Sequence, residues 1–501
     1  MKKYEIALLC IAGGLLLTFL FGRHEWKHIE INPDSRMYHL LAVNMLQGKG
    51  YYLVPVGSIE DYDTQTIERF SIKDTEVMDT EVIGKPFMAR SPGYPLFLSL
   101  IYLIHGVNVD VVLSYQIFLV GLVGTLMILT GWLMWGKFGA IMALIAVLVF
   151  GMNRDVAYPV SQLLTECLAM FFLTAAATSA AWAKKGGGWK RELLVSLIMS
   201  LAILTRPALV YVGLVYGVIL IFQSIRTSWG KIFAFAGPCT IILLAWSVYA
   251  SLESGHIILI SSNGIDNLFA GLDPVGTAEK LGLKSPELNV KSLQHFWECF
   301  PGGIGLHNDS VLRLLADIPN RLSEVILITV IKLKAGTDYL LRSLLACILL
   351  GFALTGSILW RDYSLEGKKE NVMIEVIPRG LIRSHRWIER FFLMAAFLLV
   401  IIALGFSTTI IQAFFWILPA LSPFFRLELR FREILNEGMD SAWPHWILSW
   451  YWGYFLMTMI AFGIPRFMRP FLPVFYLCAS MAIPMLVMAL MGLRNGALKQ
   501  K

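Results

Sequence analysis

Asn32–Tyr51 has the sequence NPDSRMYHLLAVNMLQGKGY and follows directly on the first long apolar segment of the chain. Pro33–Ser35 has the character of a helix start, because proline fits the first turn and the polar side chains can cap free N–H groups. The apolar residues that follow give a short helix with one apolar face, and Gly48 and Gly50 end it. We therefore predict a short helix on a membrane surface, with the carboxylate of Asp34 at its start.

The composition places the chain in a membrane. It has 501 residues, of which 57% are hydrophobic and 15% charged, and its mean hydropathy is +0.65. Soluble domains do not have this balance, so we expect a multi-pass integral membrane protein. The net charge of +7 fits basic cytoplasmic loops and does not indicate nucleic-acid binding. The six cysteines show neither a disulfide framework nor the CxxC spacing of a metal site.

Lysine and arginine in the short loops orient the spans. Lys2 and Lys3 place the N-terminus inside, and the basic stretches 184–191, 226–231, 361–390 and 494–501 mark further inside segments. Between these anchors we predict about 12 crossings, an even number because both termini are inside. After the first span they lie near 111–135, 138–152, 161–183, 191–206, 207–224, 231–251, 339–360, 391–406, 408–424, 446–463 and 471–493.

Two large outer loops interrupt the spans, at about 23–111 and about 252–322. The first contains a second surface helix at Pro92–Gly106, because its length of about 15 residues is too short for the roughly 20 that a span needs. The acidic middle of that loop, 60–81, is expected to be a solvated flap, and Arg321–Lys334 another surface helix. The predicted fold is thus one all-α domain over 1–501, a polytopic transmembrane helical bundle with juxtamembrane helices in a large first outer loop.

Ionisable side chains gather on the predicted outer face, at or near the ends of spans. Charges at that depth are costly, so such residues are functional candidates by default. A few acids among several arginines suit a phosphate-bearing substrate and an acid–base step. The set comprises Asp34, Arg36, Lys85, Arg90, Asp155, Glu166, Arg206, Arg466 and Arg469.

Each candidate also has a purely structural interpretation. In this interpretation, Asp34 is a helix cap and has no chemical role. Glu166 can hydrogen-bond to Ser161 or to a neighbouring helix, and Arg206 can mark the membrane interface at the end of a span. Lipid head groups are the alternative partners of the remaining arginines, Arg90, Arg466 and Arg469.

Six motifs occur in a fixed order along the chain: NPDSRMYHLLAVNMLQGKGY, ARSPGYPLFLSLIYLIHG, LLTECLAMFFLTAAA, LTRPALVYV, SSNGIDNLFAG and RFMRPFLPVF. In this combination the chain resembles the polyprenyl-phosphate-sugar-dependent glycosyltransferases of the GT-C superfamily. Within that superfamily it is most similar to the bacterial protein O-mannosyltransferase-like proteins and to the lipid A aminoarabinose transferase. The resemblance covers most of the chain and implies surface helices around a lipid-facing cavity, with a catalytic acid in the first outer loop.

The resemblance also assigns roles to residues. It implies Asp34 and Glu166 for catalysis, Arg90, Arg206 and Arg466 for binding the donor phosphate, and Tyr38 and Tyr94 for binding the substrate. Asp34 occupies the motif position of the catalytic base. The protein O-mannosyltransferases carry an Asp-Glu pair there, whereas Ser35 follows Asp34 in this chain, which departs from that subfamily.

The expected function is an inverting glycosyltransferase at the outer, extracytoplasmic face of a bacterial inner membrane. It would move a sugar from a polyprenyl-phosphate donor to a protein, lipid or glycan acceptor. Such a donor needs no nucleotide, which fits the absence of GxGxxG and P-loop motifs. No cofactor is expected and no metal is indicated, although Asp34 with Glu166 could hold a divalent ion.

Two alternatives to an enzyme remain. One is a polytopic lipid or glycolipid transporter, or flippase, without catalysis. Against it, the charges gather on one face and do not follow a path through the membrane midplane, and the sequence has no repeated halves. The other alternative is a non-catalytic scaffold of the same fold.

Overall fold

A computed structural model describes residues 3–22, 33–52, 86–185, 188–224, 228–263, 445–460 and 469–481. Helices dominate these ranges, and the only strand-like feature within them is the isolated bridge between Tyr52 and Pro86. The predicted all-α class is therefore confirmed for this part of the chain. The acidic flap, most of the second outer loop, the surface helix near 321–334, the spans predicted within 339–424 and Arg466 lie outside the described residues.

Four helices are long and apolar enough to cross a membrane, judged by length and composition over the described residues. They lie within α1 (Lys3–Gly22), α5 (Val109–Gly151), α7 (Thr165–Lys184) and α10 (Trp229–Ser254). Among the described residues, the shorter helices α8 (Trp189–Thr205), α9 (Val210–Ser224) and α18 (His445–Ile460) pack with them. A membrane protein with several spans is thus supported, while the count of about 12 spans stays a prediction.

Helix α5 is a hairpin of two helices rather than one rod. Its 43 residues contain a break at Trp135 and Gly136, and Gly136 has a φ of 64° that favours glycine. A Cβ on Gly131 would lie 2.5 Å from the carbonyl oxygen of Gly139. On a straight helix those two residues are about 12 Å apart, so the chain reverses between them. The break lies between the segments predicted at 111–135 and 138–152, and that each of them crosses the membrane stays a prediction.

Helix α1 packs antiparallel against the first half of α5. Gly14 lies so close to Gly121 that a Cβ on it would be 3.2 Å from the Gly121 carbonyl oxygen. Farther from the end of α1, the hydroxyl of Thr125 donates a hydrogen bond to the carbonyl oxygen of Cys10 at 3.0 Å. Small residues that allow such close backbone contact are a general means of helix association in lipid.

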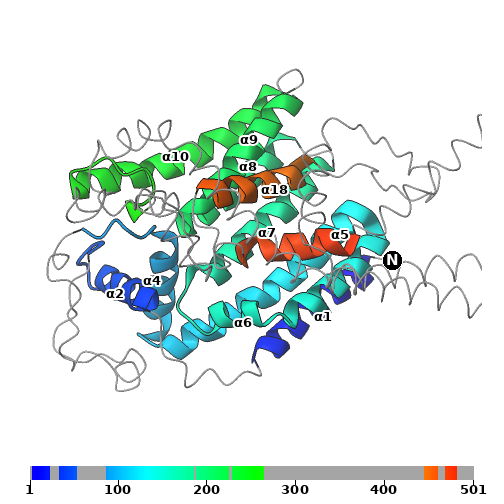
Figure 1. Ribbon diagram of the computed structural model, residues 1–501, viewed down its shortest axis with the longest axis horizontal. Coiled ribbons are helices and arrows are strands. Elements are labelled where there is room, and N and C mark those ends of the chain that lie inside the picture. The colour runs from blue at the N-terminus through cyan, green and yellow to red at the C-terminus, as the bar shows by residue number, and fades with distance from the viewer. Residues whose placement is uncertain are drawn as a thin grey trace, which may run out of the picture.

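Successive antiparallel helices give the bundle two distinct ends. Figure 1 shows α2 (Pro33–Leu46) and α4 (Gly93–His105) gathered at one end, near the last turns of α10, with the N-terminus at the other. We call the first the α2–α4 end. At the opposite end, the guanidinium of Arg191 donates to the carbonyl oxygen of Trp182 at 2.7 Å and joins the end of α7 to the start of α8.

Two short helices are present where the sequence predicted surface helices, and their place on a membrane surface stays a prediction. Helix α2 is followed by Gly48 and Gly50, which have φ of 71° and 77°. It packs on α4, where the hydroxyl of Ser99 donates to the carbonyl oxygen of Ala42 at 3.1 Å. The start of α4 lies against the end of α8, because a Cβ on Gly93 would be only 2.7–2.8 Å from backbone atoms of Leu204 and Thr205.

The segment before α7 differs from the prediction. A single span was expected from residue 161, but a short helix α6 (Arg154–Val160) is followed by a turn, and α7 begins only at Thr165. The side chain of Gln116 donates hydrogen bonds to the carbonyl oxygens of Val160 and Gln162 at 3.2 and 2.8 Å. These bonds satisfy backbone groups that would otherwise favour continuing the helix, so a turn is stable inside the bundle.

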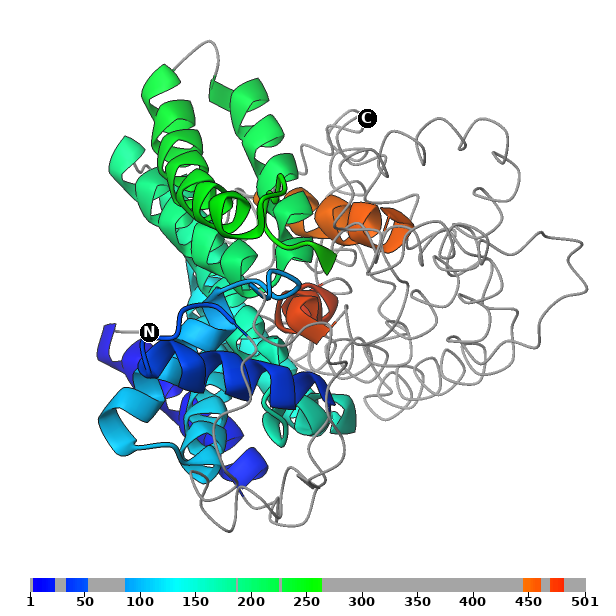
Figure 2. The same cartoon turned by 90° about the vertical axis from the view of Figure 1, so that its left-hand side faces the viewer.

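The C-terminal segments cover one side of this bundle. Helix α18 packs on α9, where a Cβ on Gly453 would lie 2.7 Å from the Cα of Val212. The short helix η8 (Arg469–Phe471) packs against α7 and leads into a helix at 472–481. Figure 2 shows α18 in orange beside the green helices and the 472–481 segment in red.

Candidate functional site

Asp34 and Arg90 form an ion pair at the α2–α4 end. The Nη2 of Arg90 donates to the Oδ1 of Asp34 at 2.5 Å, although the two residues are 56 positions apart. The side chain of Arg90 is 18% exposed and that of Asp34 is 23% exposed, so water reaches the pair. Because α2 begins at Pro33, Asp34 lies in the first turn of the helix and not at the cap. The helix dipole favours a carboxylate in the first turn.

Aromatic and sulfur groups surround the guanidinium of Arg90. Its central carbon lies 5.6 Å from the ring centroid of Tyr38, and its Nη2 lies 3.6 Å from the Sδ of Met37. Tyr38 in turn meets the ring of Tyr94 edge to face at 5.1 Å. Both predicted substrate-binding tyrosines are therefore next to the ion pair. Tyr94 is fully buried, and its hydroxyl donates to Oε1 of Gln116 at 2.8 Å.

The backbone of Arg90 is fixed by Tyr51 and Ser91. The buried hydroxyl of Tyr51 lies 3.0 and 3.1 Å from the carbonyl oxygens of Arg90 and Ser91 and donates to them. Burial raises the pKa of the Tyr51 hydroxyl well above its usual range, so this donor stays protonated. The hydroxyl of Ser91 donates to the carbonyl oxygen of Thr205 at 3.1 Å. The loop before α4 is therefore tied to the end of α8.

Glu166 and Arg206 form a second ion pair, at the start of α7 and the end of α8. The Nη1 of Arg206 lies 3.3 Å from the Oε1 of Glu166, and their side chains are 7% and 0% exposed. The same nitrogen donates to the hydroxyl of Thr165 at 3.2 Å. Ser161, one of the partners expected for Glu166, donates instead to the carbonyl oxygen of Tyr158. A pair that is so deeply buried holds α7 and α8 together and is shielded from water.

The structure thus brings the four charged site residues of the two ion pairs to one end of the bundle. Arg206 directly follows Thr205, whose carbonyl oxygen accepts the hydrogen bond from Ser91, so the two ion pairs are linked through the backbone. Arg466 lies outside the described residues, but Arg469 is described, and its guanidinium lies 5.3 Å from the ring centroid of Tyr158. No cluster of three or more His, Cys, Asp or Glu that could hold a metal is present in the described ranges.

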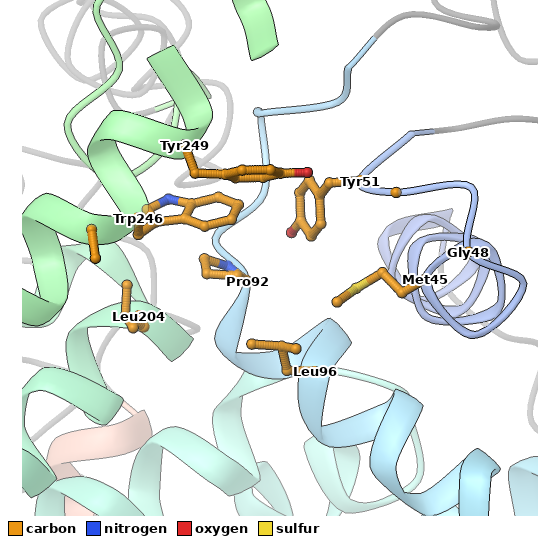
Figure 3. A pocket seen from close by; sticks show the side chains of 10 residues that line it. Met45, Gly48, Tyr51, Pro92, Leu96, Leu204, Trp246 and Tyr249 are labelled. Atoms are coloured by element: carbon orange, nitrogen blue, oxygen red, sulfur yellow. The ribbon is translucent and has the colours of Figure 1, made fainter. Parts of the chain in front are cut away.

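A cavity of about 490 Å³ lies between the end of α2, the start of α4, the end of α8 and α10. Asp34 and Arg90 do not line it, but the lining residue Tyr51 donates a hydrogen bond to the backbone carbonyl oxygen of Arg90. Figure 3 shows Tyr51, Trp246 and Tyr249 gathered along one part of it. The rings of Tyr51 and Trp246 meet edge to face at 5.2 Å, and the Trp246 Nε1 donates to the carbonyl oxygen of Ile260 at 2.7 Å. The complete lining is Met45, Gly48, Gly50, Tyr51, Pro92, Leu96, Leu204, Ala245, Trp246 and Tyr249.

The cavity continues into an apolar outer surface. Leu96 lines it and is 44% exposed, and Leu100 and Leu103 follow on the same face of α4 with exposures of 59% and 70%. Leu201 of α8, one turn before the lining residue Leu204, is 44% exposed. A row of exposed leucines on α4 therefore continues from the lining residue Leu96.

The aromatic side of the cavity was missed by the sequence-based prediction. Tyr51 is the last residue of the first motif, so its position was available, but its contact with α10 was not. Trp246 and Tyr249 lie three residues apart at the end of a span, which is also the ordinary pattern of an interfacial aromatic belt. Tyr38 and Tyr94, which were predicted to bind substrate, do not line this cavity.

The chain was compared with protein-family models, with curated proteins and with solved structures. None of the three comparisons finds a match. The function therefore has to be argued from the site itself.

Proposed function

We propose that this protein is a membrane glycosyltransferase that moves a sugar from a polyprenyl-phosphate donor to an acceptor at the α2–α4 end. The observation that supports it most is the water-accessible Asp34–Arg90 pair, which Tyr51 connects to a mostly apolar cavity. An acid, a cation and an apolar groove are the groups that a lipid phosphate and a proton transfer require.

The donor has a charged head and an apolar tail, and the site offers a partner for each. Arg90 stands two residues before Pro92, which lines the cavity, so a phosphate near Arg90 can have its chain in the cavity. The tail would continue along the exposed face of α4 that carries Leu96, Leu100 and Leu103. Apolar side chains with a few placed polar groups are typical of such ligand sites.

In the proposed reaction, Asp34 accepts the proton of an acceptor hydroxyl as its oxygen attacks the anomeric carbon. The bond between that carbon and the phosphate oxygen breaks, and the lipid phosphate leaves with the electron pair. Configuration at the anomeric carbon is inverted in this single displacement. Arg90 would stabilise the charge that develops on the leaving phosphate. Glu166, fully buried against Arg206, would keep the end of α8 in place.

The orientation in the membrane follows from the opposite end of the bundle. Lys184, Lys185, Lys190 and Arg191 lie where α7 ends and α8 begins. Positive charge of this kind marks the cytoplasmic side, so the α2–α4 end would face the outer compartment of a bacterial inner membrane.

The test is transfer from a labelled polyprenyl-phosphate sugar by the purified full chain in nanodiscs, with membrane extract as the source of acceptor. We expect donor-dependent labelling that Asp34→Asn reduces by about 100-fold or more, the usual scale of general base catalysis. Glu253→Gln is the matched control, since Glu253 is exposed at the same end and accepts a hydrogen bond from Tyr52. Movement of the intact lipid across the bilayer, unaffected by Asp34→Asn, would identify a transporter instead.

A further inference from the structure

The proposed function gives Asp34 and Arg90 two separate tasks, yet the structure has them bound to each other. Asp34 is to accept a proton, and Arg90 is to bind the donor phosphate. The same contact, Nη2 to Oδ1 at 2.5 Å, occupies both groups. A carboxylate oxygen that accepts a hydrogen bond from a guanidinium has to leave that contact before it can take a proton in the same place.

We propose that the phosphate head group of the donor displaces Asp34 from Arg90, so that Arg90 releases the carboxylate for its role as a base only when the donor is bound. This inference rests on the proposed function and adds an order of binding to it: donor first, acceptor second. When the lipid phosphate leaves the site, Arg90 pairs with Asp34 again.

The geometry of Arg90 suits such an exchange. Arg90 contacts Asp34 through one terminal nitrogen, Nη2, so the planar fork of the guanidinium is not filled by this carboxylate. The Nε of Arg90 is buried and has no hydrogen-bond partner among the described residues. A phosphate can accept from two guanidinium nitrogens at once, which makes it a stronger partner than a carboxylate bound through one oxygen.

The exchange needs only a side chain to move. The backbone carbonyl oxygens of Arg90 and Ser91 lie within hydrogen-bond distance of the Tyr51 hydroxyl, and the side-chain hydroxyl of Ser91 donates to the carbonyl oxygen of Thr205. The ring of Tyr38 supports the guanidinium from one side. By contrast, the Glu166–Arg206 pair is shielded from water, so a phosphate arriving from the membrane surface cannot displace it without opening the bundle.

Displacement of Asp34 by the donor predicts a change in phosphate affinity that a role as base alone does not. Asp34→Asn removes the competitor for Arg90, so the variant should bind farnesyl phosphate more tightly than the wild-type protein. We expect a gain of about fivefold, the size expected of a partly exposed ion pair. If Asp34 were only a base, the same change would leave binding of the phosphate unaltered.

The experiment measures binding of farnesyl phosphate, farnesol and inorganic phosphate to the full chain in detergent by thermophoresis. The proposal expects tighter binding of farnesyl phosphate by Asp34→Asn and no change for farnesol, which has no charge. Glu253→Gln again serves as control, since it removes a carboxylate at the same end that touches Tyr52 and not Arg90. Inorganic phosphate shows whether the anion alone is enough or the lipid chain is also required.

The outcomes separate this inference from the proposed function. Equal or weaker binding by Asp34→Asn, or an equal gain in Glu253→Gln, overturns the displacement, as does a wild-type protein that does not bind farnesyl phosphate. Tighter binding with normal sugar transfer keeps the displacement and removes the base. Unchanged binding with lost sugar transfer keeps Asp34 as the base and excludes the displacement. Asp34→Ser, which also suits a helix start, is measured in parallel in case the Asn variant does not fold.

Discussion

Breaking the buried Glu166–Arg206 pair from either side should cost stability, but unequally. The nitrogen–oxygen distance of 3.3 Å corresponds to an attraction of about 5 kcal/mol at an effective dielectric constant of about 20. Glu166→Gln leaves the Arg206 guanidinium buried without this counter-charge, and arginine cannot lose its proton. We expect a loss of about 3–5 kcal/mol in the free energy of unfolding, the usual cost of breaking a buried pair.

Arg206→Gln should cost less than Glu166→Gln, because a buried carboxylate can neutralise itself by taking up a proton. The double variant should be more stable than either single variant. It buries two neutral amides of similar size, and replacing both members of a buried pair is often neutral. The interaction energy of this double-mutant cycle should therefore be large and favourable.

The assay is denaturant-induced unfolding of the full chain in detergent, followed by tryptophan fluorescence and checked for reversibility. A Glu166→Gln variant within about 0.5 kcal/mol of wild type, the level of an ordinary surface substitution, would refute the reasoning. So would a double variant whose loss equals the sum of the single losses. Sugar transfer by the double variant adds a second result. If it is retained, Glu166 only positions Arg206, and if it is lost in a folded protein, Glu166 takes part in catalysis.

Three further predictions concern the same end of the bundle and its orientation. Gly93→Ala should destabilise the protein by about 1–3 kcal/mol and reduce donor use, because its Cβ would meet the backbone of α8. Gly237→Ala is the control, since a Cβ there has no atom within 4 Å, and it should be neutral or slightly stabilising in the same unfolding assay. Arg90→Ala should strongly raise the KM for the lipid donor, and Arg90→Lys should restore it only in part because lysine lacks the planar fork; unchanged kinetics in the alanine variant would exclude Arg90 as the phosphate ligand. In intact cells, a membrane-impermeant thiol reagent should label a cysteine at position 60 and not one at position 187, and the opposite pattern would invert the topology.

The surface helices were predictable because local signals define them. Proline at residue 33 and the glycines at 48 and 50 set the limits of α2, and the short apolar length of Pro92–Gly106 set those of α4. The reversal at Gly136 followed from the charge of Lys137, which requires an inside loop. The late start of α7 was not predictable, because it depends on hydrogen bonds from Gln116, a residue far away in sequence.

The candidate site was predictable as a set of residues but not as an arrangement. Sorting charges by membrane side selected Asp34, Arg90, Glu166 and Arg206, and the structure places all four at one end. Which acid meets which base depends on how α2 lies against α4 and α7 against α8. The aromatic wall of the cavity depends on the packing of the helices too, since Tyr51 belongs to the first outer loop and Trp246 to α10.

This pairing changes how the arginines can be used. Three cations on the predicted outer face suggested three ligands for a phosphate, but Arg90 and Arg206 each form an ion pair with a carboxylate. The affinity of the site for an anion is then the difference between two ion pairs and not the strength of one. A water-accessible pair can be exchanged at small cost, whereas a buried pair cannot. The donor phosphate should therefore be bound by Arg90, and Arg206 should act through the position of α8.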